Sequence, residues 1–159
     1  MEARRNSNDS LARLLRTIEP VLADGLSPYQ ISMTTTEIFS VIDKEMFQRV
    51  MKSLVDGLDD YTVDERGDVG SWVRISSIKA LGSITQLVMR SPLNDWLPRD
   101  LYLETWAGLL KQGAERLDNV RAEVGRQILQ LLLLVQSREH DTRWVPQGYE
   151  LMKKLFMEE

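Results

Sequence analysis

The stretch between residues 56 and 68 holds the densest group of side chains that could do chemistry. It carries six carboxylates against one base, Arg66; the acids are Asp56, Asp59, Asp60, Asp64, Glu65 and Asp68. One interpretation is a solvated turn whose last acids stabilise the positive end of the following helix. The other is a docking surface for a basic partner, and the residues alone leave both open.

The spacing of these residues does not match the common catalytic and ion-binding motifs. A calcium loop needs alternating acids that end in a glutamate at its twelfth position, and this pattern is absent. A phosphate-binding loop would need Gly-Lys-Ser/Thr, which does not follow Gly67 or Gly70. The lone histidine, His140, has no second histidine or cysteine with which to assemble a metal cluster. We therefore expect no enzyme activity, no catalytic residue, no metal ion and no cofactor.

Two aromatic residues at the edges of the acidic stretch favour a binding role. Tyr61 and Trp72 are of the types that anchor protein interfaces, and a connection of about nine residues is long for a pair of helices. Trp72 could instead pack on an adjacent pair of helices. The candidate partner-binding residues are Asp59, Asp60, Tyr61, Asp64, Glu65, Arg66 and Trp72.

The helix that follows must position this stretch. Asp68 stands where a helix needs an N-cap or a first-turn acid, and Arg74 can reach back towards carboxylates at the turn. Val73 begins an apolar stripe at the three-and-four spacing of one helix face. The stripe continues through Ser76, Ser77, Ala80, Leu81, Ile84, Leu87 and Val88.

The same arrangement returns 47 residues later, with Glu115, Val120 and Arg121 in place of Asp68, Val73 and Arg74. A second stripe follows through Val124, Ile128, Leu131, Leu132 and Val135. A self-similar unit of about 40 to 47 residues made of two helices is typical of HEAT and armadillo arrays. These six repeated residues are therefore predicted to be structural.

The predicted fold is an all-α, HEAT/armadillo-like α-solenoid of about seven helices, three helical hairpins plus one helix. The chain is expected to be one domain, 1–159, with units at roughly 9–42, 43–90 and 99–137 and a final helix at 143–157. Asp43 and Asp118 are predicted to cap helices. The threonines at 34–36 would suit a strand, but a lone strand would lack a partner, so a helix is predicted there and no strand anywhere.

Composition limits the classes of function. With 43% apolar and 28% charged residues, the 159-residue chain has a globular balance. It has no cysteine, so a disulfide or a zinc–cysteine site is impossible. The net charge of −4 argues against nucleic-acid binding. The longest apolar run, residues 128–135, is far shorter than the ~20 residues that a membrane span needs, and no signal peptide is expected.

Residues 59–74 also resemble a known family. The pattern Asp-Asp-Tyr-Thr…Arg-Gly-Asp-Val-Gly…Trp-Val-Arg is similar to a segment near the start of the C-terminal HEAT region of the tubulin-folding cofactor D family. Val145-Pro146, Glu150-Leu151 and Leu155-Phe156 resemble the family too, with one extra residue before Leu155. Residues 1–43 carry no recognised motif. Members of the family are far longer, so the resemblance implies a domain from the C-terminal part.

The resemblance implies a function in protein interaction. Proteins of this family capture β-tubulin and work with cofactors E and C and an Arf-like small GTPase to assemble and dismantle the αβ-tubulin heterodimer. The assembled complex stimulates GTP hydrolysis by tubulin, with the catalytic arginine attributed to cofactor C. A cytoplasmic, cytoskeleton-associated protein is thus implied. The alternative is a HEAT-type adaptor or scaffold from an unrelated complex.

Overall fold

The computed structural model describes residues 5–7, 9–10, 43–91, 93–138 and 141–157. Nearly all of the predicted first unit, 9–42, lies outside these residues, as does His140. The elements in order are α4 (Lys44–Asp56), η1 (Gly57–Asp59), β1 (Val63–Asp64), β2 (Gly67–Asp68), α5 (Gly70–Arg90), η2 (Asn94–Trp96), α6 (Arg99–Gly113), α7 (Asp118–Gln136), η3 (Thr142–Trp144) and α8 (Tyr149–Phe156). The predicted all-α class is confirmed for this part of the chain.

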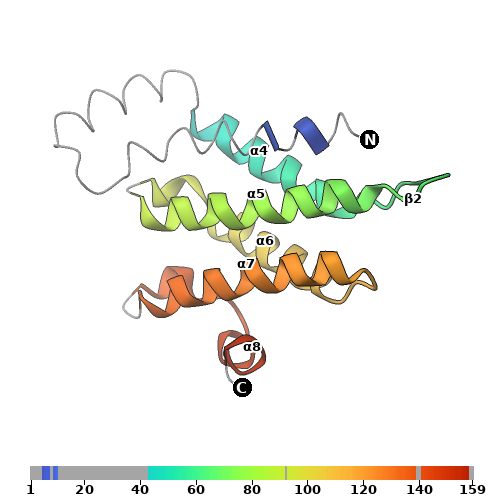
Figure 1. The fold of residues 1–159 in the computed structure, drawn as a ribbon. Helices are drawn as coiled ribbons and strands as arrows, with labels where there is room; N and C mark the ends of the chain where they lie inside the picture. The colour runs from blue at the N-terminus through green and yellow to red at the C-terminus, as the bar shows by residue number, and fades with distance from the viewer. Residues whose placement is uncertain (1–4, 8, 11–42, 92, 139–140, 158–159) are drawn as a thin grey trace.

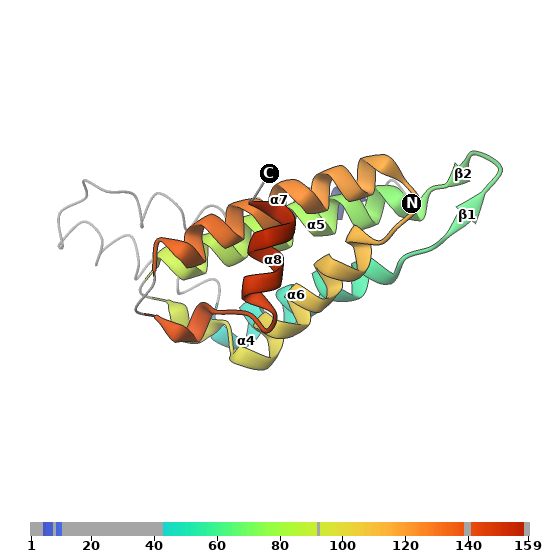
Figure 2. The ribbon, with the colours of Figure 1, turned by 90° about the horizontal axis from the view of Figure 1, so that it is seen from below.

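The long helices form two antiparallel pairs that lie side by side. α4 runs back along α5, and α6 runs back along α7 (Figure 1). α5 packs against α7 and α4 packs against α6, so the second helices form one layer and the first helices another (Figure 2). α8 packs on α7 and crosses it at a steep angle.

The core lies between these layers and is built from the apolar stripes. Val73 is 2% exposed and Val120 is fully buried. Leu81 and Ile84 of α5 and Leu131 of α7 are also fully buried. Burial of each such side chain stabilises the fold by about 1.5–3 kcal/mol before entropy is counted.

Contacts between successive helix pairs follow the repeat length of the sequence. The hydrogen-bonded partners that join them are between 42 and 54 residues apart. Examples are Gln86 with Gln130 at 3.1 Å, Gln48 Nε2 with the Trp96 carbonyl at 3.0 Å and the Tyr102 hydroxyl with the Trp144 carbonyl at 2.6 Å. Each is close to the offset of 47 residues, so residues about one repeat apart in the sequence lie next to each other.

The expectation that the chain has no strand is wrong. β1 pairs with β2 in antiparallel register, with Val63 opposite Asp68 and Asp64 opposite Gly67. The Asp64 carboxylate accepts a hydrogen bond from the Arg66 amide at 2.8 Å, and Gly67 has a φ of 103°. An aspartate that bonds the backbone two residues on, followed by a glycine with positive φ, is the chemistry of a tight hairpin turn.

The predicted helix starts were right at one position and wrong at another. Asp43 caps α4, since its carboxylate accepts from the Met46 amide at 2.7 Å. Asp118 is not a cap: it is the first residue of α7, the N-cap is Leu117, and the Asp118 side chain pairs with Arg121. An acid in the first turn still interacts favourably with the helix dipole. Among the described helices, none combines the length and apolar character that a membrane crossing requires.

The buried interface of α5 and α7 should dominate stability. Leu81→Ala removes a fully buried side chain and should lower the free energy of unfolding by about 2–5 kcal/mol. Leu155→Ala, at a leucine that is 68% exposed, is the control and should change it by less than about 0.5 kcal/mol. Urea unfolding followed by circular dichroism measures both. Equal effects would contradict the assigned core.

Candidate functional site

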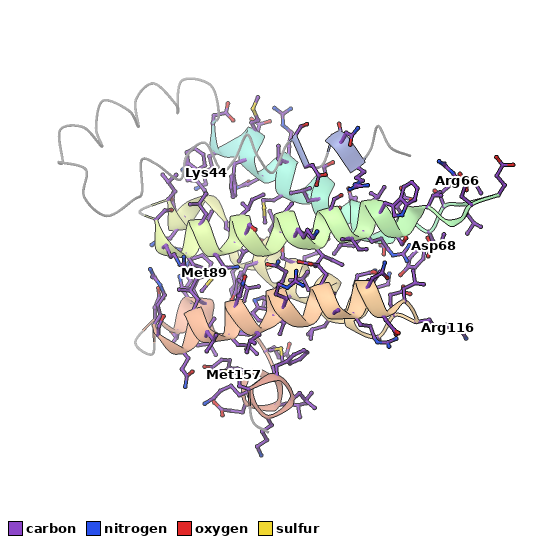
Figure 3. All side chains as sticks on the ribbon, viewed as in Figure 1. Lys44, Arg66, Asp68, Met89, Arg116 and Met157 are labelled. Atoms are coloured by element: carbon purple, nitrogen blue, oxygen red, sulfur yellow. The ribbon has the colours of Figure 1, made fainter. Side chains whose placement is uncertain are left out.

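The connection from α4 to α5 forms a hairpin that projects beyond the helix ends. We call residues 59–69 the arm; it contains β1, β2 and the turn between them. The arm extends away from both helix layers (Figures 1 and 2). Figure 3 shows Arg66 out along the arm and Asp68 at its base, beside the start of α5.

The base of the arm is held by Arg74, whose side chain is completely buried. Its guanidinium donates to both carboxylate oxygens of Asp68, at 3.2 and 2.8 Å, and to the backbone carbonyl of Asp60 at 2.7 Å. It also lies 4.3 Å from the centre of the Tyr61 ring, a cation–π distance. Arg74 therefore ties together the two ends of the arm, which leave and re-enter the helical body at this point.

Asp68, which pairs with Arg74, also bonds to the start of α5. Its carboxylate accepts from the Ser71 amide at 3.0 Å, which satisfies a free donor at the start of α5. The hydrogen bond from Arg74 is the main cause that lowers the pKa of Asp68 below its ordinary value. Asp68 is thus held as a carboxylate, the form that a buried guanidinium requires.

Gly70 allows the two ends of the arm to meet. Its amide donates to the Thr62 carbonyl at 2.9 Å. A Cβ at this position would overlap the backbone carbonyl of Asp60. Backbone has little freedom to move away, so this close approach requires glycine.

Tyr61 links the arm to the second helix pair. Its hydroxyl donates to the Glu115 carboxylate at 2.6 Å and accepts from Gln112 at 3.1 Å. The bond to Glu115 is the main cause that raises the pKa of Tyr61. Nearby, Lys111 pairs with Asp59 at 2.6 Å. The arm is therefore fixed both to its own helix and to the α6–α7 turn, where Figure 3 labels Arg116.

The second copy of the repeated motif has a different environment. Arg121 donates to the backbone carbonyls of Glu115 and Arg116, at 2.8 and 3.0 Å, but its side chain is 45% exposed. The Glu115 carboxylate, which stands where Asp68 stands, bonds Tyr61 of the arm instead. The two arginines share a role in binding turn carbonyls, whereas only Arg74 is a buried charge.

Most of the acids that were candidates for partner binding are occupied within the protein. Asp59 pairs with Lys111, and the Asp60 carboxylate accepts from the Thr62 amide and hydroxyl at 3.1 and 2.6 Å. Asp64 pairs with Arg66 at 2.6 Å, and this hydrogen bond is the main cause that lowers the pKa of Asp64. These bonds shape the arm.

Three exposed apolar or aromatic residues mark the outside of the arm and its junction with α5. Val63 is 69% exposed, Tyr61 46% and Trp72 37%. The Arg66 guanidinium lies 5.5 Å from the Trp72 ring, which also lines a small pocket. Sequence reasoning missed Val63, because one apolar residue between polar neighbours has no periodicity. Its position just before a tight turn is the signal that could have revealed it.

The carboxylates of this region do not gather around a shared point. Within the described part of the chain, no group of three or more His, Cys, Asp or Glu side chains is placed to hold a metal ion. The hydrogen bonds of Arg74, Asp64 and Tyr61 fix the hairpin, which presents an exposed surface beside the start of α5.

The buried charge at the base of the arm should matter far more than its exposed counterpart. Arg74→Met leaves Asp68 and a backbone carbonyl without their donor and should cost on the order of 3 kcal/mol. Arg121→Met, the matched variant at the exposed position, should cost less than about 1 kcal/mol. Chemical denaturation of both proteins tests this, and similar losses would refute the distinction.

The Arg74–Asp68 pair should also give a definite pH dependence. Its bond lowers the pKa of Asp68 in the folded state below the value of about 3.9 in an unfolded chain. Its contribution is therefore complete above about pH 4 and is lost as the pH falls through the folded-state pKa. The stability difference between the unmodified protein and Asp68→Asn should be constant from pH 7 to 5 and shrink towards pH 3. Denaturation at several pH values measures it; a constant difference down to pH 3 would argue against the pair.

Comparison with known proteins identifies relatives of the chain. Residues 103–159 match the family model described as tubulin folding cofactor D C terminal. The tubulin-folding cofactor D of Schizosaccharomyces pombe (strain 972) is 26% identical over 113 residues, which cover 70% of this chain and 10% of that protein. A match over that share of 159 residues necessarily includes the arm.

No solved structure matches the chain significantly. The chain spans about a tenth of the length of this curated relative. The resemblance to tubulin-folding cofactor D is thus confirmed: residues 103–159 match the model of its C-terminal region, and the chain is similar to the Schizosaccharomyces pombe protein of that name.

Proposed function

We propose that this chain is a protein-interaction module of a tubulin-folding cofactor. It contributes to β-tubulin capture and to assembly and disassembly of the αβ-tubulin heterodimer, together with cofactors E and C and an Arf-like small GTPase. The observation that carries the proposal is the match of residues 103–159 to the C-terminal family of cofactor D. The matched relative is itself named for a role in tubulin folding.

We further propose that the architecture is a HEAT-type stack. The α4–α5 and α6–α7 pairs would be successive units, and α8 would begin the next. Two features support this: the layered packing of α5 on α7 and of α4 on α6, and cross-pair contacts close to 47 residues apart. Stacked helix pairs bury their apolar faces only against neighbours, which gives an extended surface suited to binding large partners.

In this proposal the mechanism is binding by shape, without an enzymatic step in this part of the protein. A rigid stack holds its partner through distributed contacts, and the arm adds a fixed projection to one end. The partner contacts would include the exposed residues Tyr61, Glu65, Arg66 and Trp72. The protein would work in the cytoplasm, in association with the cytoskeleton.

Asp59, Asp60 and Asp64 are better explained as residues that shape the arm. Each is bonded to Lys111, Thr62 or Arg66 respectively. Replacing Asp60 and Asp64 by lysine would remove those bonds as well as reverse the charge. If such a variant lost binding, the loss could come either from the reversed charge or from the changed shape of the arm. These two substitutions are therefore not used to test the function.

The proposal is tested by binding of the whole chain to purified αβ-tubulin, alone and with cofactors E and C and the Arf-like GTPase. We expect saturable binding in analytical size exclusion or surface plasmon resonance, with a dissociation constant in the micromolar range or tighter. A HEAT-type scaffold of another system is the control for non-specific association. A folded chain that binds tubulin no better than this control, with or without the other cofactors, would favour the adaptor of an unrelated complex.

A further inference from the structure

Helix α8 is apolar on two sides. Its inner side packs on the helical body, where Met152 is 4% exposed and Tyr149 and Phe156 are partly buried against the core. Its outer side carries Leu151 and Leu155, which are 62% and 68% exposed. A surface helix ordinarily has one apolar side, which faces the core, and one polar side. The second apolar side of α8 is therefore a face that a further helix would cover.

The two leucines form one patch on an open side of the molecule. α8 packs on α7, on the side away from α5, and crosses it (Figures 1 and 2). The arm projects along the direction of the long helices and does not reach across α8 (Figure 2). Leu151 and Leu155 are four residues apart and are thus neighbours on the helix surface. Single exposed leucines are common, but this pair can enter one contact together.

The charges beside the leucines indicate which helix fits. Glu150 and Lys154 are also four residues apart, and they lie together along one edge of the leucine pair. The Glu150 side chain is 80% exposed, and its ion pair with Lys153 is long, at 4.0 Å. Within the described residues, Lys154 forms no ion pair. An acid and a base on the same edge make this face complementary in charge to itself.

A second copy of α8 packed antiparallel matches this edge. A two-fold axis at about the level of Met152 places Glu150 opposite Lys154 of the second copy, and Lys154 opposite the other Glu150. Leu151 and Leu155 then pack between the same leucines of the second copy. In a parallel pair, the charged edge of one helix would face the uncharged edge of the other. A two-fold contact in which both copies use the same patch is the commonest arrangement of homo-oligomers.

We propose that the chain forms a symmetric dimer in which the outer sides of two α8 helices pack antiparallel. Burial of the leucines supplies the affinity. Exposed ion pairs add little affinity, but they select the antiparallel orientation. A contact centred on two leucines from each copy is smaller than the ~800 Å² per partner of a standard interface, so the dimer is weak and depends on concentration. This inference goes beyond the proposed function and does not depend on it.

The first experiment measures the mass of the whole chain by sedimentation equilibrium between about 5 and 500 μM. We expect a monomer–dimer equilibrium with a dissociation constant of about 10–500 μM. Leu155→Lys puts a charge into the contact and should weaken the dimer at least about tenfold. Val63→Lys, at a residue of the arm that is 69% exposed, is the matched control and should leave it unchanged. Both variants should keep the melting temperature of the parent chain, which separates loss of contact from loss of fold.

The second experiment tests the orientation by charge reversal. Glu150→Lys gives each copy two bases on the charged edge, and Lys154→Glu gives each copy two acids. Either variant alone should dimerise at least about threefold more weakly than the parent chain, because like charges then face each other. An equimolar mixture of the two variants brings opposite charges together again. With one variant labelled by a fluorophore, the mixed dimer should form with about the affinity of the parent dimer.

Three results would overturn the inference. A parent chain that stays monomeric up to about 500 μM would show that the outer side of α8 does not bind a second copy; loss of tubulin binding in Leu155→Lys would then assign that side to another protein. A dimer that persists in Leu155→Lys, or that Val63→Lys abolishes, would place the contact elsewhere. A mixture that does not regain affinity would exclude the antiparallel arrangement. The dimer measurements use no tubulin, so the proposed function is tested separately.

Discussion

The guanidinium of Arg74 carries a permanent positive charge at a position without exposed surface. Removing such a charge from water costs several kcal/mol unless partners replace the lost hydration. The Asp68 carboxylate, the Asp60 carbonyl and the Tyr61 ring supply that replacement. The arm and the start of α5 therefore have to adopt one mutual arrangement for this charge to be tolerated.

The difference between Arg74 and Arg121 shows that a repeated motif does not fix its own environment. Both arginines follow a buried valine at the same helical position, and both bind carbonyls of the preceding turn. The turn before α7 is short and leaves Arg121 open to water. The longer connection before α5 folds back over Arg74 through Asp60 and Tyr61. The length of the connection thus decides whether the charge is buried.

The helices and their buried faces could be predicted from sequence because helical periodicity is a local signal. The stripe from Val73 to Val88 and the one from Val120 to Val135 needed only spacing to be recognised. The short hairpin was not predicted, since two-residue strands are too short for any periodicity. The residues of its turn, Asp64 and Gly67, suit a solvated turn as well as a strand pair, so they do not by themselves predict the hairpin.

The internal use of the acids could not be predicted for a different reason. The partners of Asp59 and Tyr61 come from α6 and the α6–α7 turn, more than fifty residues away. A single sequence does not show which side chains of different helix pairs contact each other. The same limit hid Val63, whose exposure depends on the direction in which the hairpin leaves the helices.

The Tyr61–Glu115 hydrogen bond has a mechanical consequence. The arm is rooted in one pair of helices and bonded to the next, so its angle depends on the spacing between the two. Bending between the α4–α5 pair and the α6–α7 pair would have to tilt the arm or break that bond. Because the arm extends well past the helices (Figure 1), it acts as a lever that converts a small change in curvature into a larger displacement of its free end.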